Sequence, residues 1–149
     1  MLWGGFSFEG KSELAEAAGI QNSTKYVEAL RNYFLPFAGT YHGDNFILQQ
    51  DSASIRASKE ADRWQKTMSI NHLQWPANSP DLNFIDSLWG ALAREAYKNR
   101  RQFKKKEDLR KCAFETWDSI KGELLPKLVD SMKSRRNEAL LAQGGKARY

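Results

Sequence analysis

The sequence predicts a small α/β domain with a helical carboxyl-terminal end. Short apolar runs within residues 2–8, 46–48 and 70–75 have the length and composition of strands, and other segments carry apolar residues at helical spacing. The chain has 149 residues, of which 41% are hydrophobic and 12% aromatic, and this is enough to bury one core. We therefore expect residues 1–149 to form a single domain.

The amino-terminal part is expected to contain two strands and a helix. Residues 2–8 predict a strand, and residues 11–18 predict a partner strand, although Glu and Ala are poor strand formers. A helix is expected from Ser23, which belongs to the residue types that cap helices, and Gly39 is expected to end it. The inward face of this helix is formed by Tyr26, Val27, Leu30, Phe34 and Phe37.

The middle of the chain predicts a strand, a helix and a second strand. The string FILQQD ends in Asp51 and is typical of a short buried strand with a carboxylate at its exit. Residues 57–67 are polar and predict a surface helix, and residues 70–75 predict a strand that stops before Pro76. Strand, helix and strand in this order imply a parallel pair of strands.

Three further helices are expected in the remaining sequence. Asn83 is expected to cap the first, whose first turn contains Asp86. Its inward face is formed by Ile85, Leu88, Trp89, Leu92 and Ala96. The second helix is marked by Leu109, Ala113, Trp117 and Ile120. The last is expected to follow Gly122 and Pro126 and to run through Leu128, Val129 and Met132.

Composition excludes several classes of protein. No apolar run approaches the roughly 18 to 20 residues that a membrane span requires, and the beginning MLWGGFSF has no signal-peptide pattern. Cys112 is the only cysteine, so there is no disulfide framework and no cysteine-built zinc site. Glycine-rich phosphate loops and Ser, His, Asp arrangements are also absent from the sequence. We expect a soluble, intracellular chain with no membrane partner and no small-molecule substrate.

Asp51 and Asp86 are the candidate catalytic and metal-binding residues, and 34 residues separate them. The end of a strand and the start of a helix can bring two carboxylates together, and paired oxygen ligands suit Mg²⁺ or Mn²⁺. Each acid also has a structural interpretation. Asp86 would face the positive end of a helix dipole, and Asp51 would be a turn residue at a strand end. Asp81 and Asn83 are interpreted as turn residues that bond their own backbone.

Positive charge is concentrated in the carboxyl-terminal part. Residues 1–93 carry 7 basic and 10 acidic side chains, whereas residues 94–149 carry 16 and 8. The densest stretch, Arg94 to Lys111, can neutralise nucleic-acid phosphates, and its alternative interpretation is a solvated linker and helix face. The candidate DNA-binding residues are Arg94, Lys98, Arg100, Arg101, Lys104, Lys105 and Lys106.

Several strings together resemble the carboxyl-terminal part of the catalytic domain of Tc/mariner-family DNA transposases. They are WGGFSFEGK, NSTKYVEALRNYFLPFA, NFILQQDSAS, WPANSPDLNFIDSLWG and the ending LVDSMKSRRNEALLAQGGKARY. The resemblance covers nearly the whole chain, and the interval between the two aspartates also fits the family. It implies a ribonuclease H-like fold, a mixed sheet with flanking helices, incomplete at the amino terminus and helical at the carboxyl-terminal end.

The resemblance also implies a function. Asp51 would be the second, and Asp86 the third, of three carboxylates that hold two divalent metal ions, Mg²⁺ or Mn²⁺. The implied activity is metal-dependent DNA strand cleavage and strand transfer in cut-and-paste transposition. DNA would be the partner, self-association is possible as in transposases, and the nucleus is the implied location.

The sequence departs from the family at several positions. The family's first catalytic Asp lies upstream of the Trp-Gly-Gly strand, and Asp44, in a turn, cannot replace it. Arg56 stands where the family often has His, Ser52 where it has Asn, and Phe84 where it has Pro, and the Arg56 cation would oppose metal binding. We expect a truncated transposase copy that is inactive alone. The alternatives are a non-catalytic basic DNA-binding protein and a non-functional transposon relic.

Overall fold

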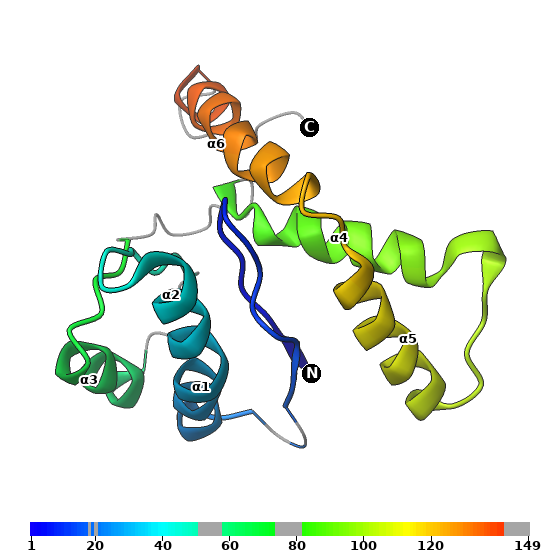
Figure 1. The fold of residues 1–149 in the computed structure, drawn as a ribbon, viewed down its shortest axis with the longest axis horizontal. Coiled ribbons are helices and arrows are strands. Elements are labelled where there is room, and N and C mark those ends of the chain that lie inside the picture. The colour runs from blue at the N-terminus through cyan, green and yellow to red at the C-terminus, as the bar shows by residue number, and fades with distance from the viewer. Residues whose placement is uncertain (18, 20, 51–57, 74–81, 142–149) are drawn as a thin grey trace. The chain divides into compact units, whose positions relative to one another are not determined.

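Helices make up most of the structure, which is shown as a ribbon in Figure 1. The computed structural model describes residues 1–17, 19, 21–50, 58–73 and 82–141. The chain divides into two compact units. The first comprises Met1–Gly5 and Lys11–Ser79, and the second comprises Phe6–Gly10 and Pro80–Tyr149. The single domain expected for residues 1–149 stays a prediction.

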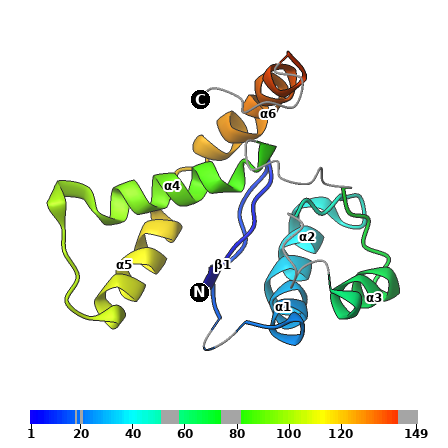
Figure 2. The same ribbon diagram turned by 180° about the vertical axis from the view of Figure 1, so that it is seen from behind.

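The chain opens with a hairpin, visible beside the β1 label in Figure 2. Strand β1 (Leu2–Trp3) pairs antiparallel with β2 (Ala15–Glu16), which confirms the expected amino-terminal strand pair. Farther along the hairpin, the Ser12 N–H donates to the Gly5 carbonyl, and the Gly5 N–H donates to Ser12 Oγ, both at 2.9 Å. A buried Ser12 hydroxyl therefore takes the place of a strand carbonyl, and this shortens the regular ladder.

The predicted first helix is present and continuous, but its cap is one residue earlier than expected. It consists of α1 (Ser23–Ala29), the π-helical turn η1 (Leu30–Phe34) and α2 (Leu35–His42). Asn22 caps it, because Asn22 Oδ1 accepts the Lys25 N–H at 2.9 Å. Asn22 and Ser23 are both capping residue types, so composition alone could not choose between them.

Pro36 explains the wide turn in the middle of this helix. In α geometry the proline ring would clash with the carbonyl of Asn32, four residues earlier, and proline has no N–H to donate. The Leu35 N–H instead donates to the Leu30 carbonyl, five residues back. One π-helical turn thus admits the proline without ending the helix.

The expectation that Gly39 ends the helix was wrong. The helix continues to His42 and ends at Gly43, whose φ of 58° and ψ of −127° suit a residue without Cβ. A glycine inside a helix lowers stability by about 1 kcal/mol. Burial of Phe34 and Ala38 on the same helix outweighs that cost.

A parallel contact joins the two strand segments predicted in the middle of the chain. Leu48 and His72 form a parallel bridge, in which the Leu48 N–H donates to the Asn71 carbonyl at 2.8 Å. The Leu73 N–H donates back to the Leu48 carbonyl at 2.9 Å. The predicted parallel pairing is therefore confirmed, as a bridge rather than a long ladder in the part of the chain that is described.

The expected surface helix lies between these segments as α3 (Lys59–Thr67), which begins after the cap Ser58. At its end, the Ile70 N–H donates to the Gln65 carbonyl at 2.9 Å, and Ser69 adopts a left-handed φ of 53°. This closing turn directs Ile70 inward. The core of the first unit is formed by Tyr26, Val27, Leu30, Phe34, Ala38, Leu48, Ala61 and Ile70.

The second unit contains the three predicted carboxyl-terminal helices. They are α4 (Ile85–Ala96), α5 (Lys106–Ser119) and α6 (Leu124–Leu141), with the short 3₁₀ turn η3 (Lys98–Arg100) between α4 and α5. The helix α6 begins two residues before Pro126 rather than after it. A proline in a first helical turn removes only an N–H that has no helical acceptor.

The helices α4 and α5 bury their apolar faces against each other. Trp117 is fully buried, and its ring stacks on Trp89 with centroids 5.4 Å apart and an interplanar angle of 27°. The other buried residues of this pair are Leu88, Leu92, Ala96, Cys112, Ala113 and Thr116. The expectation that Trp89 lies on the inward face of its helix is confirmed. No helix in the described part of the chain combines the length and the apolar character that crossing a membrane demands.

The contact between α1 and α3 should make stability sensitive to acid. The Ser23 hydroxyl, and to a lesser extent the Thr24 hydroxyl, donates to the Glu60 carboxylate and lowers the pKa of Glu60 below its ordinary value of 4.5. Because the folded state binds this proton less tightly, the carboxylate adds stability above pH 4.5 and loses it as pH falls through the lowered pKa. We expect Glu60→Gln to lower the urea midpoint at neutral pH and to flatten its decline in acid.

Glu28→Gln is the matched control, since Glu28 is an exposed carboxylate on α1. It should leave the acid limb of the urea-midpoint profile as in the wild-type chain. Equal acid limbs for the wild type and Glu60→Gln would contradict the prediction.

Candidate functional site

Asp86 lies in the first turn of α4, as predicted, but Asn83 does not cap this helix. Phe84 precedes the helix without a capping side chain, and Asn83 Nδ2 instead donates to Asp86 Oδ2 at 3.2 Å. The Phe84 ring packs edge-on against Phe6, with centroids 5.0 Å apart. Aromatic packing by Phe84, where the Tc/mariner pattern has Pro, thus helps to set the start of the helix.

The Asp86 carboxylate is exposed, and Asn83 restrains one of its two oxygens. An acid in the first turn also interacts favourably with the helix dipole, so the structural interpretation of Asp86 holds. It does not compete with the functional one, because an exposed carboxylate oxygen is also the ligand type that Mg²⁺ and Mn²⁺ prefer. Asp86 therefore has the chemistry and the accessibility that a metal ligand needs.

Arg135 of α6 contacts Ser87, the residue that follows Asp86. Arg135 Nη2 donates to Ser87 Oγ at 2.7 Å, and Arg135 Nε donates to Ser131 Oγ at 3.1 Å. The Ser131 hydroxyl in turn donates to the Leu128 carbonyl at 2.6 Å. Sequence reasoning did not single out Arg135, because the contact joins residues 48 positions apart and leaves no local pattern.

Asp51 lies outside the described residues, as do Ser52, Arg56 and Asp81. The preceding residue, Gln50, is described, and its Oε1 accepts hydrogen bonds from Tyr26 Oη and from Gln65 Nε2. Among the described residues, no three His, Cys, Asp or Glu side chains gather at one point. The predicted meeting of Asp51 and Asp86 at a metal therefore stays a prediction.

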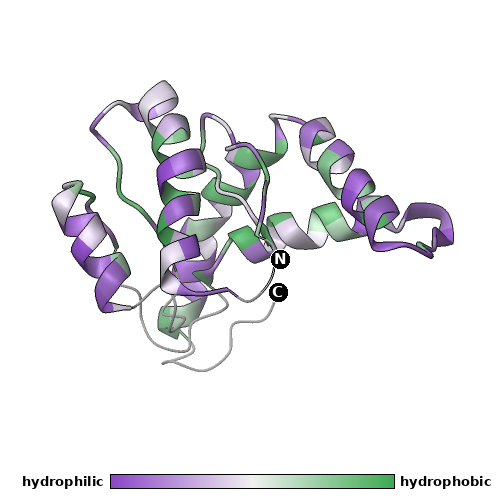
Figure 3. Cartoon of the chain, turned by 90° about the horizontal axis from the view of Figure 1, so that it is seen from below, coloured by the Kyte–Doolittle hydropathy of each residue, from purple (hydrophilic) through white to green (hydrophobic). Residues whose placement is uncertain are grey.

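We call residues 97–105, which link α4 to α5, the basic connector. Figure 3 shows it as mostly hydrophilic. Asn99 and Arg100 both adopt a left-handed φ of 58°. The Tyr97 and Phe103 rings meet edge-on with centroids 5.5 Å apart, and Tyr97 remains half exposed. This aromatic pair and the left-handed turn give the connector a defined conformation.

The seven candidate DNA-binding residues fall into two groups. Arg101 lies 5.3 Å from the Phe103 ring centre, and its Nη1 is 3.3 Å from Cys112 Sγ, while Lys98 pairs with Glu95 at 3.1 Å. Both side chains therefore have partners within the fold. The side chains of the second group are exposed and make no hydrogen bond or ion pair within the described residues: Arg94, Arg100, Lys104, Lys105 and Lys106.

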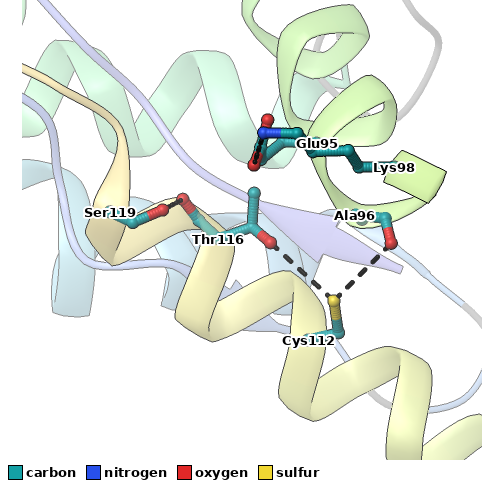
Figure 4. Close-up of polar contacts among 6 residues, drawn as sticks. All are labelled: Glu95, Ala96, Lys98, Cys112, Thr116 and Ser119. Carbon is teal, nitrogen blue, oxygen red and sulfur yellow. Dashed lines mark hydrogen bonds and ion pairs between the residues drawn. The ribbon is translucent and has the colours of Figure 1, made fainter. Parts of the chain in front are cut away.

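Cys112 anchors the connector to the interface between α4 and α5. Its Sγ lies 3.9 Å from the Ala96 carbonyl oxygen and 3.8 Å from Thr116 Oγ1, as Figure 4 shows. The Arg101 contact adds a third partner, so one buried sulfur joins both helices and the connector. Cys112 thus has a structural role in placing the exposed cations.

Residues 4–110 match the family of DDE superfamily endonucleases, and the chain belongs to that family. It is similar over all of its 149 residues to the transposable element Tc3 transposase of Caenorhabditis elegans, with 35% identity over 45% of that protein. It is also similar to the Tcb2 transposase of Caenorhabditis briggsae, with 29% identity over 154 residues, covering the whole chain and 54% of the relative. The chain spans about half the length of these curated relatives.

Two solved structures share the fold. The Mos1 mariner paired end complex with Mn gives a TM-score of 0.77 at 18% identity, covering 91% of this chain and 40% of that chain. The catalytic domain of Mos1 mariner transposase gives a TM-score of 0.72 at 17% identity, covering 99% of this chain and 82% of that chain. The predicted ribonuclease H-like fold and the resemblance to Tc/mariner transposases are both confirmed.

Removing the Cys112 sulfur should loosen the α4 and α5 interface. Cys112→Ala deletes a buried atom with three described contacts, so we expect the free energy of unfolding in urea to fall by about 1 to 2 kcal/mol. Because Cys112 is only 5% exposed, a thiol reagent should modify the native protein far more slowly than the urea-unfolded chain. Equal modification rates would contradict the assigned anchoring role.

Proposed function

We propose that the chain is the carboxyl-terminal part of a DDE transposase catalytic domain that acts on DNA. The family match over residues 4–110 carries the proposal, since that range includes both Asp51 and Asp86. The proposed activity is metal-dependent DNA strand cleavage and strand transfer. Nuclear location and self-association, which the resemblance implies, are part of the same proposal.

Asp51 and Asp86 are proposed to hold the divalent cation, Mg²⁺ or Mn²⁺. Their carboxylate oxygens are the donor type that these hard cations take, and the exposed position of Asp86 supports this role. When bound, the metal would activate an attacking oxygen and neutralise phosphate charge. Asn83, which donates to one Asp86 oxygen, would orient the carboxylate for binding.

We infer that the 149 residues alone do not cleave DNA. The Tc/mariner pattern uses three carboxylates, and this sequence supplies counterparts of two. Arg56, where that pattern often has His, adds a cation beside Asp51 in the sequence and would weaken metal binding further.

A second function, DNA binding without cleavage, is favoured by the lysines at the end of the basic connector and the start of α5. Lys104, Lys105 and Lys106 stand at or just before the start of α5, where cations oppose the positive end of the helix dipole. Helix stability therefore does not account for them. Phosphate binding does, because clustered exposed lysines release counterions from DNA when they bind.

Purified protein incubated with supercoiled plasmid and Mg²⁺ or Mn²⁺ should produce no nicking above the metal-only background. The physical reason is that the first of the three carboxylates has no counterpart among these 149 residues, so the metals lack a full set of ligands. Nicking that Asp51→Ala abolishes, and that the control Asp44→Ala leaves intact, would show the inference of inactivity to be wrong.

Replacing Lys104, Lys105 and Lys106 together by Gln should weaken binding to random-sequence duplex DNA. Each lost phosphate contact removes about 0.9 from the slope of log affinity against log salt, so we expect the slope to fall by roughly 2 to 3. Filter binding across a salt series measures it. The matched control replaces Lys121, Lys127 and Lys133, which are also exposed, and should change the slope little. If the slope fell equally in the two triple variants, the effect would come from net charge alone and not from a DNA-binding site at Lys104, Lys105 and Lys106.

A further inference from the structure

A hydrogen bond joins Arg135 of α6 to Ser87 of α4. Ser87 is the neighbour of Asp86 in the first turn of α4, and Arg135 comes from the fourth turn of α6. The guanidinium donates to Ser87 Oγ at 2.7 Å through Nη2, while Ser131 Oγ, one turn earlier on α6, accepts from Nε at 3.1 Å. Two acceptors on different helices thus fix both the position and the plane of the guanidinium.

Apolar packing alone does not place the Arg135 side chain. Among the described residues of α6, Leu125 in the first turn is the one that is buried, and Arg135 lies ten residues farther along, beyond the half-buried Leu128, Val129 and Met132. Helix stability does not account for it either, because a cation at the amino-terminal end of α4 opposes the helix dipole. A directional hydrogen bond at that place therefore serves to locate the first turn of α4.

We propose that Arg135 is a positioning residue for the acid site. Through Ser87 it holds the first turn of α4, and so sets the direction in which Asp86 presents its carboxylate to a divalent cation. Asn83 restrains one carboxylate oxygen from the other side of the same turn. This inference rests on the proposed function, in which Asp86 is a metal ligand.

Positioning and simple electrostatics predict opposite results. Removing a cation close to a metal site would strengthen metal binding if charge alone mattered, because like charges repel. If Arg135 positions Asp86, its removal weakens binding, as the loss of residues that orient metal ligands does by about tenfold or more. The sign of the change therefore separates the two explanations.

The test is Mn²⁺ affinity of the full 149-residue chain, measured by electron paramagnetic resonance of free Mn²⁺. Arg135→Gln should weaken affinity about tenfold, and Arg135→Lys should restore part of it, since lysine reaches one acceptor but not both. Arg136→Gln is the matched control, with the same charge change at the exposed neighbouring position, and should leave affinity unchanged. Stronger binding by Arg135→Gln would overturn the proposal.

Ser87→Ala provides an independent variant if Arg135→Gln fails to fold. It should weaken Mn²⁺ binding as Arg135→Gln does, and the double variant should bind no more weakly than either, because both remove the same contact. Unchanged affinity in Ser87→Ala would also overturn the proposal. Asp86→Asn tests the metal-ligand role of Asp86 separately from the positioning role of Arg135. If this variant leaves Mn²⁺ affinity unchanged, the proposed function itself fails. If it weakens binding while Arg135→Gln does not, the positioning role alone fails.

Discussion

The second unit depends on the packing of α5 against α4, centred on the fully buried Trp117 and its stacked partner Trp89. This packing fixes α4, which has an exposed acid in its first turn and is followed by the basic connector. Cys112 ties the connector to the same interface. The candidate groups of this unit are therefore placed by buried side chains beneath them rather than by the connecting loops.

Helices were the most predictable part of the fold, because a buried face leaves a repeating pattern in the sequence. Leu88, Leu92 and Ala96 recur at the spacing of one helix face, and all three are buried. The ends of helices were less predictable. Pro36 and Gly39 belong to residue types that often end helices, yet this helix continues past both, because burial along the whole segment outweighs their cost and no single residue type signals that burial.

The candidate site also has a part that local sequence predicts and a part that it does not. The place of Asp86 in a first helical turn follows from neighbouring turn residues, so local sequence predicted it. The role expected of Asp51 depends on the apolar string FILQQD and on the resemblance to Tc/mariner transposases. The contacts of Arg135 with Ser87, and of Arg101 with Cys112, join separate segments and could not be predicted. These contacts decide which charged side chains are anchored and which are available to a ligand.

The length of α4 has a consequence for any duplex that this unit binds. Asp86 and Tyr97 are eleven residues apart, and at about 1.5 Å of rise per residue the helix separates them by roughly 16 Å. Successive phosphates of one DNA strand advance about 3.4 Å along the duplex axis, so for a duplex whose axis runs along α4 this interval corresponds to roughly five nucleotides. Under the proposed function and in that orientation, the length of α4 sets the distance between the phosphates bound by the connector and the reacting phosphate, and one extra helical turn would change it by more than one base step.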